Sequence, residues 1–178
     1  MLSEEELLGN CILLLAAGHG TTTHLLGNGT LALLRHPGQY QLLKEKPDLL
    51  PLAVMELLRY DGPVQVTARK ATADLTIRDK KIEAGQKVLI SLGGASHDPA
   101  QFAEPDELDI QRIENRHLAF GHGIHYCLGA PLARLEAEIA FGTLMRRLPN
   151  PRIENEAEAE FFPGMVFRGL NELPIVLG

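Results

Sequence analysis

The chain has 178 residues, of which 45% are hydrophobic and 22% are charged, a composition typical of a folded globular protein and not of a disordered one. Its 17 Lys and Arg residues face 23 Asp and Glu residues, which gives a net charge of -6. Because nucleic-acid binding depends on clustered basic side chains, this balance argues against a nucleic-acid partner. A small molecule or another protein is the expected partner.

The sequence shows neither a secretory signal nor a membrane span. Consecutive acids, Glu4 to Glu6, occupy the N-terminus, where a secretory signal requires positive charge. The apolar run over residues 11–17 is too short to cross a bilayer. Cys11 and Cys127 lie far apart in the sequence, so they indicate no disulfide framework. We therefore expect a cytoplasmic protein without membrane contact, in which one cysteine is available for chemistry.

A long helix is predicted from Ser3 to about Leu34. Ser3 and Glu6 have the spacing of a capping box, and apolar residues then recur at helical intervals. Four glycines interrupt this apolar stretch: Gly18, Gly20, Gly27 and Gly29. Since each glycine costs about 1 kcal/mol relative to alanine within a helix, they indicate a kink or a close approach of another element.

Shorter elements follow this helix. Further helices are predicted over 39–46, 51–60 and 130–148, and antiparallel strands over 64–70, 75–77, 81–83 and 87–91. Residues 93–120 are rich in turn formers and predict a long ordered loop. The last helix is expected to face inward with Leu132, Leu135, Ile139 and Leu144. The predicted fold class is mainly α with small antiparallel β-sheets (α+β), in a single region over 1–178.

The segment 120–130 is the strongest candidate for chemistry. It holds three glycines, two histidines and Cys127 directly before a predicted helix. A thiolate at a helix N-terminus is stabilised by the helix dipole and by free backbone N–H groups, which suits it to bind iron. The glycines would let the backbone pass close to a flat macrocycle. A zinc site remains an alternative, with His117, His122 and His125 joining the cysteine.

This segment resembles the signature of the cytochrome P-450 family, Phe-x-x-Gly-x-[Arg/His]-x-Cys-x-Gly. The fixed positions are matched by Phe120, Gly123, His125, Cys127 and Gly129. Two further family motifs occur in the expected order, Ala17-Gly18-His19-Gly20-Thr21-Thr22 and Glu56-x-x-Arg59. The resemblance covers essentially the whole chain, but only the C-terminal, haem-binding part of a family member. The N-terminal half of the family fold has no counterpart.

The resemblance implies a haem b cofactor with Cys127 as the axial thiolate and metal ligand. The other residues implied to lie at the haem are Ala17, Gly18, Thr21, Arg69, Ala119, Phe120, Gly121, His125 and Gly129. Among them, Arg69 and His125 would pair with the haem propionates, and Thr21 would be the catalytic residue that handles protons. Glu56 and Arg59 would form a buried ion pair with Arg112 as its third member.

The implied function is that of a haem-thiolate monooxygenase, which inserts one oxygen atom of O2 into a small hydrophobic substrate. Val64, Val66 and Met165 are candidate substrate contacts. Electrons would come from a ferredoxin or flavodoxin-type donor, docked at Arg112, Arg116 and Arg134.

Two departures from the family pattern affect this expectation. Gly20 stands where an acid usually precedes the threonine, and without an N-terminal half residues 7–15 should be exposed. Exposed apolar surface favours association, so a homodimer or a domain-swapped assembly is expected if the chain folds alone. A non-catalytic haem-binding or interaction module and a zinc-dependent structural protein remain as alternatives.

Overall fold

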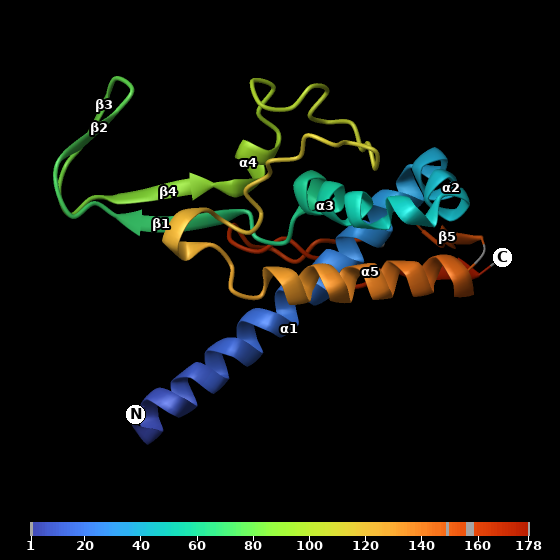
Figure 1. Cartoon of the computed structure of the whole chain (residues 1–178), viewed down its shortest axis with the longest axis horizontal. Coiled ribbons are helices and arrows are strands. Elements are labelled where there is room, and N and C mark those ends of the chain that lie inside the picture. Colours follow the sequence, from blue (N-terminus) through green and yellow to red (C-terminus); the bar gives the residue numbers. More distant parts are fainter. Residues whose placement is uncertain (1, 149, 156–158, 178) are drawn as a thin grey trace.

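The computed structural model describes residues 2–148, 150–155 and 159–177. Its longest element is helix α1 (Glu4–Arg35), which begins at the predicted capping box. The backbone N–H of Glu6 donates to Ser3 Oγ at 3.2 Å, and the N–H of Ser3 donates to Glu6 Oε2 at 2.8 Å. The C-terminal half of α1 lies within the body of the molecule, and its N-terminal half projects from the body (Figure 1).

Three further helices build the core around the C-terminal half of α1. They are α2 (Pro37–Glu45), α3 (Leu50–Asp61) and α5 (Ala130–Arg147), with a 3-10 turn, η1 (Pro47–Leu49), between α2 and α3. Helices α1, α3 and α5 pack against one another pairwise. Their buried side chains include Leu25, Leu33, Leu57 and Phe141. The core therefore lies where three apolar helix faces meet.

Gly29 explains how closely these helices approach. A Cβ at this position would lie 2.6 Å from Phe141 Cζ and 3.2 Å from Leu57 Cδ1. The glycine therefore admits a side chain from α5 and one from α3, which confirms the predicted close approach at this site. At Gly18 and Gly20 a Cβ would meet nothing within 4 Å, so those positions serve no packing contact within the described chain.

The described strands form three antiparallel two-stranded sheets. In the first, β1 (Val66–Lys70) pairs with β4 (Lys87–Ser91). Between them, β2 (Leu75–Ile77) and β3 (Lys80–Ile82) form a hairpin that extends from the body (Figure 1). In the third, β5 (Pro151–Ile153) pairs with β6 (Ile175–Leu177) near the C-terminus. The predicted fold class and the local hairpins are thus confirmed.

The prediction of a loop over 93–120 was wrong at its start. Residues Leu92–Ser96 form a short helix, α4, in which the N–H of Gly94 donates to Ser91 Oγ at 3.1 Å. A five-residue helix containing two glycines is too short to show a periodicity that sequence analysis can detect. A 3-10 turn, η2 (Gly123–His125), also lies within the candidate segment before α5.

The predicted inward face of α5 was wrong as well. Leu132, Leu135 and Ile139 are 53–61% exposed, whereas Ala137 and Phe141 are buried. Close packing on α1 and α3 selects the face that carries the small Ala137 and the ring of Phe141, because Gly29 leaves room for that ring. Leu144, in contrast, packs against the core as predicted.

Of the helices that the structure describes, none combines the length and the apolar character needed to cross a bilayer. The cytoplasmic location stays a prediction.

Candidate functional site

A buried carboxylate organises the region that leads to the candidate segment. Glu56 on α3 is 0% exposed and Arg59, one turn later, is 1% exposed. Arg59 Nε and Nη2 each donate to one oxygen of the Glu56 carboxylate at 2.8 Å. Arg112 Nε donates to the same carboxylate at 3.2 Å. The predicted buried pair and its third member are therefore both present.

The structure adds partners that sequence reasoning missed. Asn115 Nδ2 and the backbone N–H of Asp109 donate to Glu56 at 3.0 Å each. Arg59 also donates to the carbonyl groups of Ser96, Pro105 and Glu107. One ion pair thus fixes the irregular chain between α4 and residue 115, because charge-assisted hydrogen bonds replace regular secondary structure there.

The segment that carries Cys127 is a turn held by backbone geometry. Gly121 and Gly123 have φ angles of 70° and 69°, a left-handed conformation that favours glycine. The N–H of Cys127 donates to the carbonyl of Phe120 at 2.9 Å, and the N–H of Ala130 donates to the Cys127 carbonyl at 3.3 Å. The thiol itself is exposed. This turn therefore presents a thiol to its surroundings at the start of α5.

Phe120 anchors this turn to the body. Its ring lies 5.9 Å from the His117 ring and 6.2 Å from the Tyr126 ring, centroid to centroid. The Arg134 guanidinium lies 5.2 Å from the Phe120 ring centroid, and its Nη2 donates to Tyr126 Oη at 2.8 Å. Two aromatic rings, an imidazole and a guanidinium therefore support the chain on which the thiol sits.

His117 is the least expected member of this group. Its Nδ1 accepts a hydrogen bond from the N–H of Ala119 at 3.1 Å, which assigns the ring proton to Nε2. Burial, reinforced by the positive charges of Arg134 and Arg59, lowers the pKa of His117 to about 4. The imidazole is neutral at pH 7 and supports the Cys127 turn from inside. Nothing in the residues around His117 predicts that its side chain turns away from solvent.

The zinc alternative is contradicted by this geometry. Among the residues that the structure describes, no three His, Cys, Asp or Glu side chains lie close enough to hold a metal ion. His117 is already engaged with the backbone, whereas a structural zinc site uses four protein ligands. A single exposed thiol fits an iron whose other ligands come from a macrocycle. The donor set therefore fits haem.

The other predicted haem residues lie in three places: on α1, on β1 and in the Cys127 turn with its flanks. Ala17, Gly18 and Thr21 lie on α1, where Thr21 Oγ1 donates to the Ala17 carbonyl at 2.6 Å. Arg69 lies on β1 with an exposed side chain, and its Nη1 donates to Thr67 Oγ1 and to the Ala68 carbonyl. The remaining members belong to the Cys127 turn and its flanks: Ala119, Phe120, Gly121, His125 and Gly129.

Two of the candidate substrate contacts meet at one cavity. A cavity of about 300 Å³ lies between β1 and the C-terminal tail, and both Val66 and Met165 line it. Val64 lies beside it, bridged to Phe167. The lining also includes aromatic residues: Phe161, Phe162 and Phe167. Gln65, Ser91 and Arg168 complete much of the lining, so this cavity offers apolar and polar surface together.

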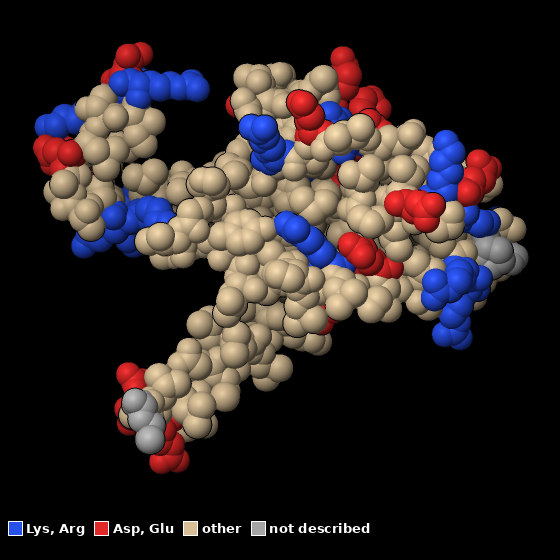
Figure 2. Space-filling model, viewed as in Figure 1, with Lys and Arg blue, Asp and Glu red and all other residues tan. Residues whose placement is uncertain are grey.

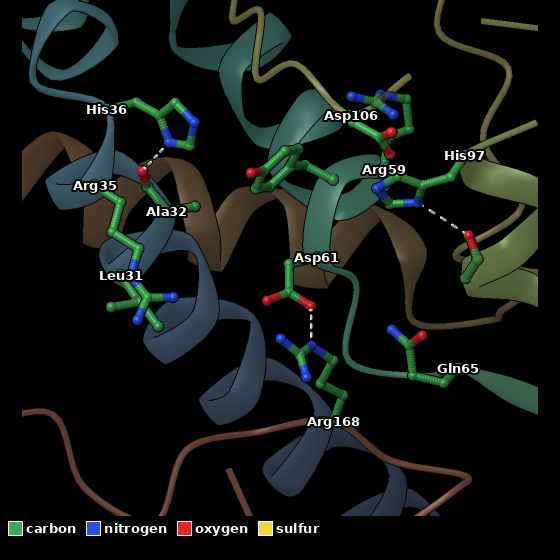
Figure 3. Close-up of a pocket in the computed structure, with 12 residues that line it drawn as sticks. Leu31, Ala32, Arg35, His36, Arg59, Asp61, Gln65, His97, Asp106 and Arg168 are labelled. Atoms are coloured by element: carbon green, nitrogen blue, oxygen red, sulfur yellow. Dashed lines mark hydrogen bonds and ion pairs between the residues drawn. The ribbon is translucent and has the colours of Figure 1, made fainter. Parts of the chain in front are cut away.

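A second cavity, of about 340 Å³, is polar (Figure 3). His36 and His97 line it, and each ring donates through Nδ1 to a backbone carbonyl of the preceding helical turn. Asp61 and Arg168 point toward one another there, with Arg168 Nε 2.6 Å from Asp61 Oδ1. Burial raises the pKa of the Asp61 carboxyl, and the Arg168 guanidinium offsets part of that rise. None of the residues predicted to bind haem lines this cavity.

Asn28 on α1 bonds to the backbone of two residues that line the polar cavity. Its side chain is 0% exposed and donates to the carbonyl groups of Asp61 and Arg168 at 3.1 Å each. It thereby ties α1 to α3 and to the C-terminal tail. Sequence reasoning missed Asn28, although a polar residue among the apolar residues of a helix was a usable signal.

Comparison with known proteins decides the family. The model of the family described as Cytochrome P450 matches residues 1–159 of the chain. The chain belongs to the cytochrome P450 family. It is 53% identical over 175 residues to the cytochrome P450 CYP107DY1 of Priestia megaterium, and 49% identical over 174 residues to the biotin biosynthesis cytochrome P450 of Bacillus subtilis. These matches cover 98% of the chain in both cases, but 43% and 44% of the relatives.

Solved P450 structures agree with this assignment. The chain superposes with a TM-score of 0.96 on P450BioI in complex with an acyl carrier protein carrying hexadec-9Z-enoic acid, at 48% identity. It reaches the same TM-score on the tirandamycin C-bound P450 monooxygenase TamI, at 45% identity. In each case 99% of this chain matches less than half of the solved chain, 46% and 45% respectively. The fold is therefore part of the P450 fold.

Proposed function

We propose that this chain is the haem-binding part of a P450 monooxygenase, with Cys127 as the axial thiolate. The observation that carries the proposal is the exposed thiol of Cys127 on a turn fixed by two left-handed glycines and by the Phe120 carbonyl. Bound haem b would supply the activation of O2 and its insertion into a C–H bond. This chain corresponds to the C-terminal part of the family fold.

The chain's own residues would orient the cofactor and the thiol. The bond from the Cys127 N–H to Phe120 fixes the direction of the Cys127 backbone, so the thiol is positioned before any ligand arrives. Arg69 and His125 are both exposed, and their side chains would pair with the haem propionates. Ala17, Gly18 and Gly129 would offer small surfaces against the flat ring.

Thr21 is the proposed proton-handling residue. Its Oγ1–H donates to the Ala17 carbonyl, so the oxygen lone pairs remain available to accept a hydrogen bond from a ligand. Gly20 supplies no acid beside it. A Cβ at Gly20 meets nothing within 4 Å, so a Glu side chain has room there.

Gly20 makes a direct test of proton delivery possible. In a full-length P450 assembled around this chain, Gly20→Glu should lower the yield of hydrogen peroxide per electron pair consumed. Gly20→Gln, which has the size of glutamate but carries no acid, serves as the matched control. An unchanged peroxide yield in Gly20→Glu would show that an acid at this position does not govern coupling.

We assign the substrate to the class of small hydrophobic molecules. The cavity lined by Val66, Met165 and three phenylalanines supports this assignment. The names of relatives point the same way: one solved relative is bound to tirandamycin C, and another relative is a vitamin D(3) 25-hydroxylase.

The electron donor would be a ferredoxin or a flavodoxin-type protein. Of the three arginines expected to meet it, Arg116 is exposed, whereas Arg112 is committed to Glu56 and Arg134 is partly buried at Phe120. Fewer positive charges are therefore available to an electron donor than the three arginines in the sequence suggested.

The test is an absorbance spectrum of the chain with haem, reduced by dithionite and exposed to carbon monoxide. A red-shifted, thiolate-type Soret band in wild type and Cys11→Ser, but not in Cys127→Ser, would support the assignment. A histidine-type band in all three proteins would overturn it. Product formation with peroxide then separates an enzyme from the alternative, a non-catalytic haem-binding or interaction module.

A further inference from the structure

The Cys127 turn carries two imidazoles that compete with its thiol for iron. His122 and His125 lie a few positions before Cys127, and all three side chains are exposed. Imidazole is itself an axial ligand of haem iron. Residues 117–133 contain no Lys, Arg, Asp or Glu, and Figure 2 shows the surface of the turn before α5 as uncharged. Charged side chains of the turn therefore do not select the thiol, so the selection depends on the geometry of the backbone.

His117 fixes the chain just before this turn. Its Nδ1 accepts the N–H of Ala119 at 3.1 Å, the two-residue hydrogen bond by which an asparagine side chain closes a turn. The N–H of Gly121 donates to the carbonyl of Leu118 at 2.8 Å. Ala119 also lies against the end of α3, since a Cβ on Gly62 would lie 3.4 Å from its Cβ. The path of the chain at Ala119 therefore depends on one side-chain acceptor.

The residue after Ala119 holds Cys127. The carbonyl of Phe120 accepts the N–H of Cys127 at 2.9 Å. The His117 ring lies 5.9 Å from the Phe120 ring, centroid to centroid. A change at His117 thus reaches Cys127 through one peptide and one hydrogen bond.

The acceptor distinguishes His117 from a residue that only fills space. A phenylalanine ring would pack at this position without the cost of burying a polar group. Imidazole adds the acceptor at Nδ1. Burial, reinforced by the positive charges of Arg134 and Arg59, lowers the pKa of His117 to about 4, so Nδ1 stays unprotonated at pH 7.

We propose that His117 is a positioning residue that keeps Cys127, and not an imidazole of the same turn, as the ligand of the iron. By accepting the N–H of Ala119, it holds the Phe120 carbonyl in place. That carbonyl holds the Cys127 backbone so that the thiol is presented. Without the acceptor the turn loosens, and a histidine of the turn takes the iron. The inference rests on the proposed function, in which Cys127 is the axial thiolate.

Three variants separate the acceptor from the ring. His117→Phe keeps a ring against Phe120 but removes the acceptor. His117→Asn removes the ring but keeps the acceptor, because Oδ1 of asparagine stands where Nδ1 of histidine stands. His122→Phe is the matched control, since His122 is exposed on the same turn.

The first readout is the exchange rate of the Cys127 amide in the chain without haem, measured by NMR. In His117→Phe this exchange should be about tenfold faster than in wild type, because the hydrogen bond to Phe120 opens more often. In His117→Asn and His122→Phe it should stay within about twofold of wild type. The amide of Leu57 in α3 should exchange equally in every variant, which shows that the body is folded. If His117→Phe changes the Leu57 rate, His117→Met, which fills the site flexibly without an acceptor, takes its place.

The second readout is the spectrum of the chain with haem, reduced by dithionite and exposed to carbon monoxide. The ratio of the thiolate-type band to the histidine-type band should fall about tenfold in His117→Phe. His117→Asn should restore this ratio to within about twofold of wild type. A residue that only fills space predicts the reverse order of the two variants.

Either of two results would overturn the proposal. One is Cys127 amide exchange in His117→Asn as fast as in His117→Phe. The other is an unchanged band ratio in His117→Phe. If the exchange rates change as expected but wild type shows no thiolate-type band, the positioning of the turn is supported and the proposed function fails.

Discussion

Helix α1 carries leucines in both of its halves, but the two halves differ in how far these leucines are buried. In its C-terminal half, Leu25, Leu31 and Leu33 are at most 2% exposed. In its N-terminal half, the leucines between residues 7 and 15 are more than half exposed. Both halves belong to one continuous helix. The difference lies in what surrounds them, since α3 and α5 reach only the C-terminal half. Apolar residues therefore favour burial, but they become buried only where another element packs against them.

The largest loss of stability is expected from removing the fully buried carboxylate of Glu56. Glu56→Gln leaves the guanidinium groups of Arg59 and Arg112 without their carboxylate, and should lower the free energy of unfolding by about 3–5 kcal/mol. Urea denaturation measures this loss. Glu45→Gln, on the exposed surface of α2, is the control and should change stability by less than about 0.5 kcal/mol. Equal losses for the two variants would contradict the role of the buried network.

The two halves of α1 can be compared directly by making the same leucine-to-alanine change in each half. Leu31→Ala should cost about 2–5 kcal/mol of unfolding free energy, because it removes buried methyl groups and leaves a cavity. Leu14→Ala in the N-terminal half, where the side chain is exposed, should cost less than about 0.5 kcal/mol. Equal losses of stability for the two variants would contradict the difference in burial between the two halves of α1.

His117 makes the stability of the body depend on pH. Its pKa is about 4 in the folded chain and near 6.5 when unfolded, so the unfolded state binds more protons between these values. Stability should therefore fall as the pH drops from about 6.5 to 4, by roughly 3 kcal/mol. Thermal melting over this range measures the slope. His117→Gln should flatten it and His125→Gln should not, since His125 is exposed.

The smallest change in stability is expected from alanine substitutions at two glycines of α1, Gly29 and Gly20. Gly29→Ala should destabilise the chain by about 1–3 kcal/mol, because the new Cβ would press on Phe141 and Leu57. Gly20→Ala meets no neighbour and should stabilise α1 by up to about 1 kcal/mol through helix propensity. Melting temperatures that move in the same direction for both variants would contradict this assignment.

The sequence predicted the local features well, and for a physical reason. The capping box at Ser3, the hairpin strands and the Glu56–Arg59 pair each depend on residues a few positions apart, whose geometry the backbone dictates. The choice of Arg112 as third partner came from the family resemblance and is confirmed. The role of Cys127 stays a prediction, supported by its exposed position.

The sequence could not determine which surfaces meet. The spacing of Leu132, Leu135 and Ile139 predicted an inward face, yet α5 turns Ala137 and Phe141 inward because Gly29 and Leu57 complement that face. Asn28 became a buried polar residue for the same kind of reason, since its partners, the carbonyl groups of Asp61 and Arg168, are brought to it by the fold. By itself the sequence determined the longer helices, the thiol-bearing loop and the family pattern, because these depend on local geometry. Only the tertiary structure decided which apolar face is covered, because burial requires a complementary surface from elsewhere in the chain.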